Sequence, residues 1–118
     1  MSYDIRLKCK CCGQTLTLEE NHGLKGGTYC LSGSDECALN ITYNYAPFYV
    51  EVFGDKGIRW LYGKTAGSTI AMLDVAIEDL GAERAEDYWD ATRGNAGAAL
   101  ADLLVLAKAK PGGVWDGD

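Results

Sequence analysis

The segment Leu39-Asn40-Ile41-Thr42-Tyr43-Asn44-Tyr45 decides the fold of this 118-residue chain. Apolar and polar side chains alternate along it, which is the period of a β-strand with one apolar and one polar face. Leu39, Ile41 and Tyr43 make up the apolar face. We therefore expect a strand over residues 39–45, whose polar face of two asparagines and a threonine is available for hydrogen bonding.

Length and composition bound the class of protein. Hydrophobic residues make up 47% and charged residues 24% of the chain, which is an ordinary globular composition and predicts one domain over residues 1–118. No apolar run reaches the ~20 residues that a membrane helix needs, and Met1-Ser2-Tyr3-Asp4 does not resemble a signal sequence. We therefore expect a cytoplasmic protein without a membrane partner.

The net charge of −6 bears on the partners. Attraction to nucleic-acid phosphates depends on clustered Lys and Arg side chains, so this charge disfavours a nucleic-acid partner. An acidic surface that docks on a basic protein is compatible with the charge, and so is an acidic balance that only keeps the protein soluble.

The first 45 residues have mainly β patterns. Residues 3–8 and 15–18 alternate, which predicts a hairpin with cysteines at its tip. Residues 28–31 are strand-like and a turn follows at 32–35, so a second hairpin is expected before the central strand. The result is a small antiparallel sheet.

The cysteines predict a structural zinc site. Cys9 and Cys12 have the C-x-x-C spacing of a zinc knuckle, and Gly13 follows. Tetrahedral zinc needs two more ligands, for which Cys30 and Cys37 are the candidates. Four protein ligands leave no position for water, so this Zn²⁺ would join the hairpins and perform no chemistry.

Two alternatives to this ligand set stay open. A third hypothesis is that all these thiols are ordinary buried or incidental side chains and bind no metal. Cys11 could replace Cys9, and His22 could replace one of the distal cysteines.

Residues 46–118 are mainly helical. A helix starts near Pro47 and stops at Gly54, and residues 58–62 form a short apolar element of undecided type. Ser68 is expected to cap a second helix, which Gly81 closes, with an apolar stripe of Ile70, Leu73, Ile77 and Leu80.

A last helix is expected from Asn95 as the cap through Ala107, ended by Pro111. Residues 82–91 are read as a loop or a short helix. Residues 112–118 are expected to form a flexible tail, with Trp115 folded back onto the body. The predicted fold is α+β, a small antiparallel sheet with a zinc-stapled hairpin end packed against two or three helices.

Seven of the twelve aromatic residues fall between positions 43 and 62, and polar side chains are interleaved with them. Aromatic faces with amides and cations can hold a base or a sugar, although each aromatic taken singly is more typical of a core. The candidate ligand-binding residues are Asn40, Thr42, Asn44, Tyr45, Arg59, Tyr62, Lys64 and Thr65.

Catalysis has little support in the sequence, and no catalytic residue is assigned. A single histidine in a loop, His22, is more typical of a surface residue or a metal ligand than of a general base. Gly63-Lys64-Thr65 is similar to the end of a P-loop, but Ile58 stands where the first glycine of that motif would fall. ATP or GTP binding by this route is therefore rejected.

A longer set of motifs resembles a family of small proteins from tailed bacteriophages and prophages. The motifs are Gly26-Gly27-Thr28-Tyr29, Leu39 through Tyr45, Gly57-Ile58-Arg59, Leu61 through Thr65, Gly94-Asn95-Ala96, and Pro111 through Gly117-Asp118. The resemblance implies a phage context, with the host cytoplasm as the location, and it implies no particular chemistry. It also implies a working surface around the asparagine-rich strand and the tail, with the metal as a local staple.

The leading hypothesis is a non-enzymatic phage accessory protein that binds and blocks or sequesters a host factor, with counter-defence as one such role. A small-ligand binding protein, for example for a nucleotide signal, is the first alternative. A small enzyme or a zinc-dependent nucleic-acid binder is the second. Assembly of the chain into a homo-oligomer is left open.

Overall fold

The computed structural model describes residues 1–26 and 34–118. Its β-strands are β1 (Ser2–Lys8), β2 (Thr17–His22), β3 (Ser34–Glu36), β4 (Ala38–Thr42) and β5 (Val114–Gly117). The α-helices are α1 (Ala46–Phe53), α2 (Ala66–Leu80) and α3 (Arg93–Ala109), and the 3-10 turns are η1 (Tyr43–Tyr45) and η2 (Gly57–Leu61). An α+β fold with small antiparallel sheets and three helices is thus confirmed.

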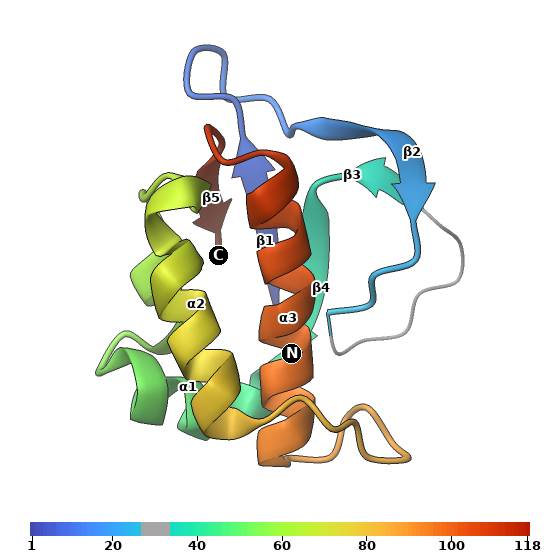
Figure 1. Cartoon of the computed structure of the whole chain (residues 1–118), viewed down its shortest axis with the longest axis vertical. Helices are drawn as coiled ribbons and strands as arrows, with labels where there is room; N and C mark the ends of the chain where they lie inside the picture. The colour runs from blue at the N-terminus through green and yellow to red at the C-terminus, as the bar shows by residue number, and fades with distance from the viewer. Residues whose placement is uncertain (27–33) are drawn as a thin grey trace.

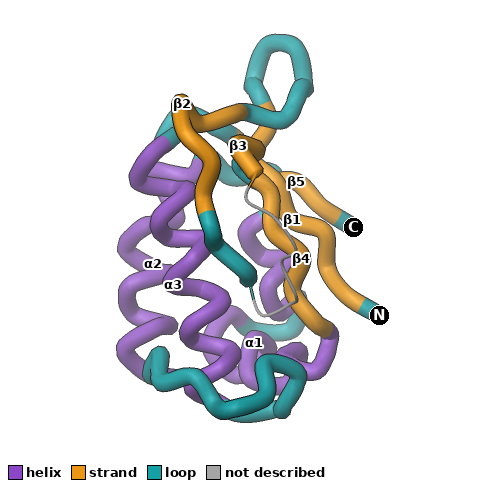
Figure 2. The backbone as a smooth tube through the Cα atoms, turned by 90° about the vertical axis from the view of Figure 1, so that its right-hand side faces the viewer, coloured by secondary structure: helices purple, strands orange, loops and turns teal. Residues whose placement is uncertain are grey.

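The main sheet has the order β4-β1-β5, and all its neighbours are antiparallel. Tyr3, Ile5 and Leu7 of the central strand β1 are buried on one face, which the helices cover (Figures 1 and 2). Helices α2 and α3 lie side by side along this face and supply Leu73, Leu100 and other apolar side chains to the core. Burial of these alternating apolar positions is the main stabilisation of the fold.

The central segment is shorter as a strand than expected. Strand β4 ends at Thr42, and Tyr43–Tyr45 form a 3-10 turn, because the Thr42 Oγ1 atom accepts a hydrogen bond from the backbone N–H of Asn44 (3.2 Å) and turns the chain into α1. As a result Tyr45 is fully buried, whereas Tyr43 is only half-buried. The expected alternation therefore holds for residues 39–42 and is wrong for residues 43–45.

The first predicted hairpin is correct at its tip and in the first pairs beyond it, where Lys8 bridges to Thr15 and the Leu16 N–H donates to the Leu7 carbonyl (2.9 Å). The backbone N–H of Cys9 donates to the Gln14 carbonyl (2.7 Å) and that of Gly13 to the Cys9 carbonyl (2.9 Å), which closes the turn. Beyond the turn, β2 leaves the main sheet and pairs with β3. The predicted second hairpin falls partly on residues 27–33, which lie outside the described residues.

The C-terminal segment is a strand, so the expected flexible tail over residues 112–118 is wrong for residues 114–117. Residues 114–117 pair with β1, and the other edge of β5 bonds to the 63–65 segment, for example from the Trp115 N–H to the Lys64 carbonyl (2.9 Å). Trp115 is fully buried, as expected, and its indole N–H donates to the Thr69 hydroxyl (2.9 Å). The tail is therefore part of the core.

The predicted helix caps are also corrected. Thr65 rather than Ser68 occupies the N-cap position of α2, and Thr92 rather than Asn95 caps α3 by accepting the Asn95 N–H (3.1 Å). Asn95 lies inside the first turn of α3, where it is 2% exposed.

Candidate functional site

The residues predicted to form one ligand site fall into separate groups. Asn40 donates from its Nδ2 atom to the Ser2 hydroxyl and the Asp4 carboxylate, both at 2.7 Å. Arg59 donates to the carbonyl of Asp118 (2.8 Å), and its guanidinium lies 5.0 Å from the centre of the Tyr3 ring. Both side chains therefore tie down the end of the sheet around the first and last strands.

Tyr62 lies beneath β5 at this same end. Its hydroxyl oxygen is buried, and within residues 1–26 and 34–118 it has no hydrogen-bond partner. Burial, followed by the negative charge of Asp118, raises the pKa of Tyr62 well above its usual range. The Cβ atom of any residue replacing Gly117 would press against this ring, so the strand and the tyrosine are closely packed.

Lys64, Thr65 and Thr42 have structural partners as well. Lys64 donates to the carbonyl of Trp60 (2.5 Å), and its ammonium lies 4.1 Å from the centre of that ring. Thr65 begins α2 and bridges to Val114 of β5. Like Thr42 at the start of η1, Lys64 and Thr65 shape the chain. Thr42 bonds only to the backbone N–H of Asn44 among these candidates, and no hydrogen bond joins Lys64 or Thr65 to the Asn44 side chain in the described residues.

Asn44 and Tyr45 contact a different part of the molecule, the α2–α3 loop (residues 81–92). The Asn44 Nδ2 atom donates to the carbonyl of Trp89 (2.6 Å), and the Tyr45 hydroxyl donates to the carbonyl of Tyr88. The loop lies at the lower end of the molecule in Figure 1, opposite the cysteine turn. These two predicted residues are thus supports of this loop.

Asn95 supports the loop from the helix side. Its Nδ2 atom donates to the carbonyls of Asp87 and Asp90, both at 3.0 Å, and its Oδ1 atom accepts the backbone N–H of Ala85 (2.8 Å). One buried amide therefore satisfies three backbone groups of an irregular segment, which otherwise would have to remain hydrated.

Two glycines let the loop approach α3 this closely. A Cβ atom on Gly94 or Gly97 would lie less than 3.0 Å from the backbone carbonyls of Glu83 and Gly81 respectively. Real Cβ atoms essentially never approach that closely, so only glycine fits without moving the loop. The sequence Gly94-Asn95-Ala96-Gly97 is thus a docking surface for the loop backbone.

The loop held in this way displays Trp89, whose side chain is 51% exposed. The Trp89 ring meets Tyr88 edge-on, with 5.1 Å between ring centres. Four carboxylates belong to the same loop, namely Glu83, Glu86, Asp87 and Asp90. Its one arginine, Arg84, is paired with Asp102 at 2.9 Å. The loop therefore offers an aromatic side chain with acidic neighbours.

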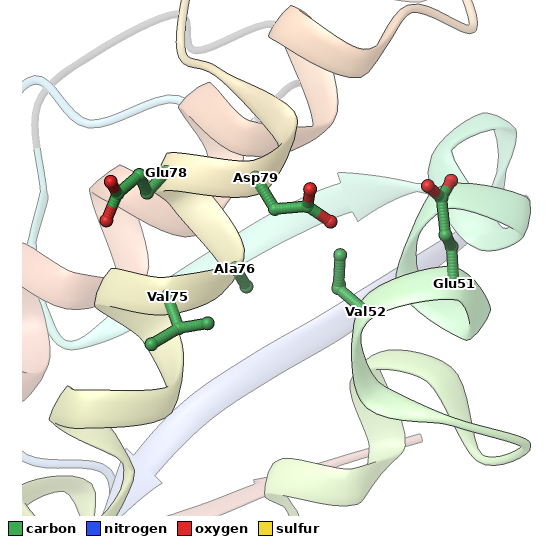
Figure 3. Close-up of a pocket in the computed structure, with 6 residues that line it drawn as sticks. All are labelled: Glu51, Val52, Val75, Ala76, Glu78 and Asp79. Carbon is green, nitrogen blue, oxygen red and sulfur yellow. The ribbon is translucent and has the colours of Figure 1, made fainter.

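A second surface feature is a hollow of about 550 Å³ between α1 and α2, lined by Val52, Ala76 and the exposed Val75 among others (Figure 3). Glu51 and Asp79 face each other across it, and Arg93 reaches Glu51 Oε1 at 2.7 Å and Asp79 Oδ1 at 3.6 Å. The hydrogen bond that Arg93 donates to the Glu51 carboxylate raises the pKa of Arg93. Glu51 and Asp79 are therefore already paired with Arg93 of the same chain.

The described cysteines lie in two separate places. Cys9, Cys11 and Cys12 share the first turn, Cys37 is fully buried in the hydrophobic core, and Cys30 lies outside the described residues. In the described part of the chain, no group of three or more His, Cys, Asp or Glu side chains is placed to hold a metal ion. The Cys9/Cys12/Cys30/Cys37 zinc staple therefore stays a prediction.

Burial, followed by smaller effects of Lys110 and Asp35, raises the pKa of the Cys37 thiol. At the turn the direction is opposite. The backbone N–H groups of Cys12 and Cys11, followed by the Cys12 thiol, hydrogen-bond to the Cys9 sulfur and lower its pKa.

His22, the alternative metal ligand, has both ring nitrogens in hydrogen bonds. Nε2 lies 2.6 Å from the carbonyl of Glu36, and Nδ1 lies 3.2 Å from the backbone nitrogen of Leu24. Since a carbonyl can only accept, Nε2 carries the proton and Nδ1 accepts from Leu24. His22 therefore joins β2 to the neighbouring backbone.

Sequence reasoning missed Trp89, Asn95, Gly94 and Gly97 as parts of one surface. The signal that could have found them is the pair of glycines three apart beside an asparagine at the start of a helix, a position where neither residue favours helix formation.

Comparison with family models, curated proteins and solved structures found no match. Among the helices in the described ranges, none combines the length and apolar character needed to cross a membrane.

Proposed function

We propose that the protein is a phage accessory protein that binds a host protein and blocks it, with the α2–α3 loop as its contact surface. The observation that carries the proposal is the exposed Trp89 on a loop fixed by Asn44, Tyr45 and Asn95. The phage context is supported only by the motifs that resemble the family described above.

A fixed, exposed tryptophan favours protein binding for two reasons. A tryptophan side chain contributes a large apolar area at low cost in side-chain entropy, which is why it is enriched among the residues that dominate binding energy. A loop already held in one conformation also loses little backbone entropy on binding. The partner therefore needs an apolar pocket for the indole.

The acidic residues near Trp89 indicate which side chains should surround the partner's pocket. Glu86, Asp87 and Asp90 surround Trp89 in the sequence, and Arg84 is occupied by Asp102. The chain as a whole has a net charge of −6. Complementary Lys and Arg side chains around the partner's pocket would speed association and disfavour acidic competitors.

The ligand-binding alternative gains no support from the arrangement of its residues. Asn40 and Arg59 are bonded at the sheet end, whereas Asn44 and Tyr45 are bonded at the loop. A thermal-shift screen with nucleotides tests this alternative, and a shift that Arg59→Gln removes would revive it.

The test begins with affinity capture from a bacterial host lysate and continues with the captured protein purified alone. Titration calorimetry of the purified pair should give a 1:1 complex, and Trp89→Ala should weaken it by roughly 30-fold or more, as for a dominant interface residue. The matched control is Val105→Ala, since Val105 is 50% exposed on α3 and is expected to change the affinity less than about twofold.

Three outcomes would overturn the proposal. Trp89→Ala could bind as tightly as the unchanged protein, Val105→Ala could weaken binding equally, or the only partner could be a second copy of the chain. Light scattering of the purified protein detects the last case.

A further inference from the structure

The hollow between α1 and α2 is a surface that the proposed function does not use. Its apolar lining comes from both helices, with Val52 on α1 and Val75 and Ala76 on α2 (Figure 3). Among the large apolar side chains of the described residues, Val75 is the most exposed after Met1, at 62%. An exposed valine beside two other apolar side chains offers area that a partner can remove from water.

Carboxylates border this apolar lining on both sides. Glu51 and Asp79 lie on the side between the two helices, whereas Glu78 points away from α1 along the outer side of α2 (Figure 3). Within residues 1–26 and 34–118, Glu78 forms no ion pair. Three carboxylates therefore stand against the one guanidinium of Arg93, and an excess of negative charge remains at the hollow.

Arg93 holds the hollow in shape. Its Nη1 atom donates to both carboxylate oxygens of Glu51, at 2.7 and 2.9 Å, and its Nη2 atom donates to the carbonyl of Asp79 at 3.1 Å. One side chain of α3 thus ties α1 to α2. A groove that is already formed loses little conformational entropy when a partner binds.

We propose that the α1–α2 hollow binds a basic amphipathic helix of a partner protein. Glu78 and Asp79 follow Val75 by three and four positions, so all three side chains lie within about one turn of α2. A partner helix lying along this turn places apolar side chains over Val75 and its Lys or Arg side chains at the two carboxylates.

The charge and the apolar lining together select this occupant. A second copy of the chain carries the same net charge of −6, which disfavours it, and nucleic acid and anionic lipid are disfavoured in the same way. A small inorganic cation would pair with the carboxylates but leave the apolar lining in water. A helix with an apolar stripe between cationic side chains matches both features.

The test uses the full-length protein and a fluorescent peptide of about 18 residues, made of leucine and lysine placed so that the leucines form one helical face. Fluorescence anisotropy should show saturable 1:1 binding, and a peptide with glutamate in place of lysine should not bind. Amide chemical shifts of the labelled protein should change most at residues 51–52 and 75–79. Since neither the probe nor the variants involve the host protein, this test and that of the Trp89 surface fail separately.

Glu78→Lys tests the charge. It should weaken binding of the leucine–lysine peptide about tenfold, and added salt should reduce that difference. The matched control is Glu20→Lys, which changes the net charge equally at an exposed position of β2 and should weaken binding less than about twofold.

Val75→Ala tests the apolar lining. It should weaken binding of the same peptide about threefold, because less apolar area is removed from water. Its control is Val105→Ala, since Val105 is 50% exposed on α3 and does not line the hollow. That variant should bind the peptide like the unchanged protein.

The inference is overturned if the leucine–lysine peptide shows no saturable binding, or if Glu78→Lys binds it as tightly as the unchanged protein does. Equal weakening by Glu20→Lys would also overturn it, because binding would then follow the net charge alone. So would chemical-shift changes located away from the hollow. A dimer in light scattering that Val75→Asp dissociates would assign the hollow to a second copy of the chain instead.

Discussion

The α2–α3 loop and the end of the sheet around Tyr62 differ in how their buried polar groups are satisfied. The loop has no regular hydrogen-bond ladder, yet Asn95 bonds to three of its backbone groups. Strand β5 has a regular ladder, yet the hydroxyl beneath it has no partner among the described residues. A buried side chain can thus satisfy irregular backbone, whereas a regular ladder does not by itself satisfy the side chain packed beneath it.

The largest effect is expected from Gly97→Ala, which pushes the loop away from α3. The new Cβ atom would overlap the carbonyl of Gly81, so the free energy of unfolding should fall by about 3 kcal/mol. Urea denaturation followed by tryptophan fluorescence measures it. Gly112→Ala is the control, since it has open space around it and should change the stability by less than about 0.5 kcal/mol.

Asn95→Ala should have the next largest effect. It removes three hydrogen bonds from part-buried loop groups, which should cost about 2–3 kcal/mol of unfolding free energy and open the loop to proteases. Asn44→Ala, whose amide is exposed and makes one described bond to the loop, should cost less than about 1 kcal/mol. Equal losses in both variants would contradict the role given to Asn95.

Tyr62→Phe should act in the opposite direction. Removing a buried hydroxyl without a partner should leave the stability unchanged or raise it by about 1 kcal/mol at neutral pH. A destabilised Tyr62→Phe protein would show that the hydroxyl is bonded in solution.

The contribution of Tyr62 to the free energy of unfolding depends on pH with a definite sign. Because the pKa of Tyr62 is higher in the folded state than the ordinary value of 10.0, the folded state holds this proton more tightly than the unfolded chain does. Its contribution to stability is complete below pH 10 and is lost as the pH rises further towards the folded-state value. Stability measured between pH 9 and pH 11 should therefore fall more steeply in the unchanged protein than in Tyr62→Phe.

Arg59→Gln should have the smallest effect. Arg59 is exposed and holds the end of the sheet through the Asp118 carbonyl and the Tyr3 ring, so its loss should cost about 0.5 kcal/mol or less. Measuring the free energy of unfolding of Arg59→Gln at low and high salt separates the electrostatic part of this loss. A loss comparable to that of Asn95→Ala would remove the contrast between the two regions.

The sequence predicted the elements whose signal is local. The alternation of residues 3–8 and 39–42 and the helix between Pro47 and Gly54 can be read from neighbouring residues, and so can the burial of Trp115. The strand at 114–117 could not, because its stability comes from pairing with residues more than 100 positions away.

The candidate ligand site stays a prediction, and the structure does not bring its residues together. The partners of Asn44 and Tyr45 are the carbonyls of Trp89 and Tyr88, which no spacing rule connects to them. The predicted polar face assumed that residues 43–45 continue the strand. One hydroxyl, that of Thr42, ends the strand and directs these side chains elsewhere.

The position of β1 between β4 and β5 has a consequence for synthesis on the ribosome. Residues 2–8 leave the ribosome with both backbone edges unpaired, more than 100 residues before β5, and their second neighbour is complete only when residue 117 has left the exit tunnel. Until then one edge is open to pairing with other nascent chains. This strand order therefore predicts slow folding, because the contacts that complete the sheet are distant in the sequence. It also predicts sensitivity to fusions that delay release of the C-terminal segment.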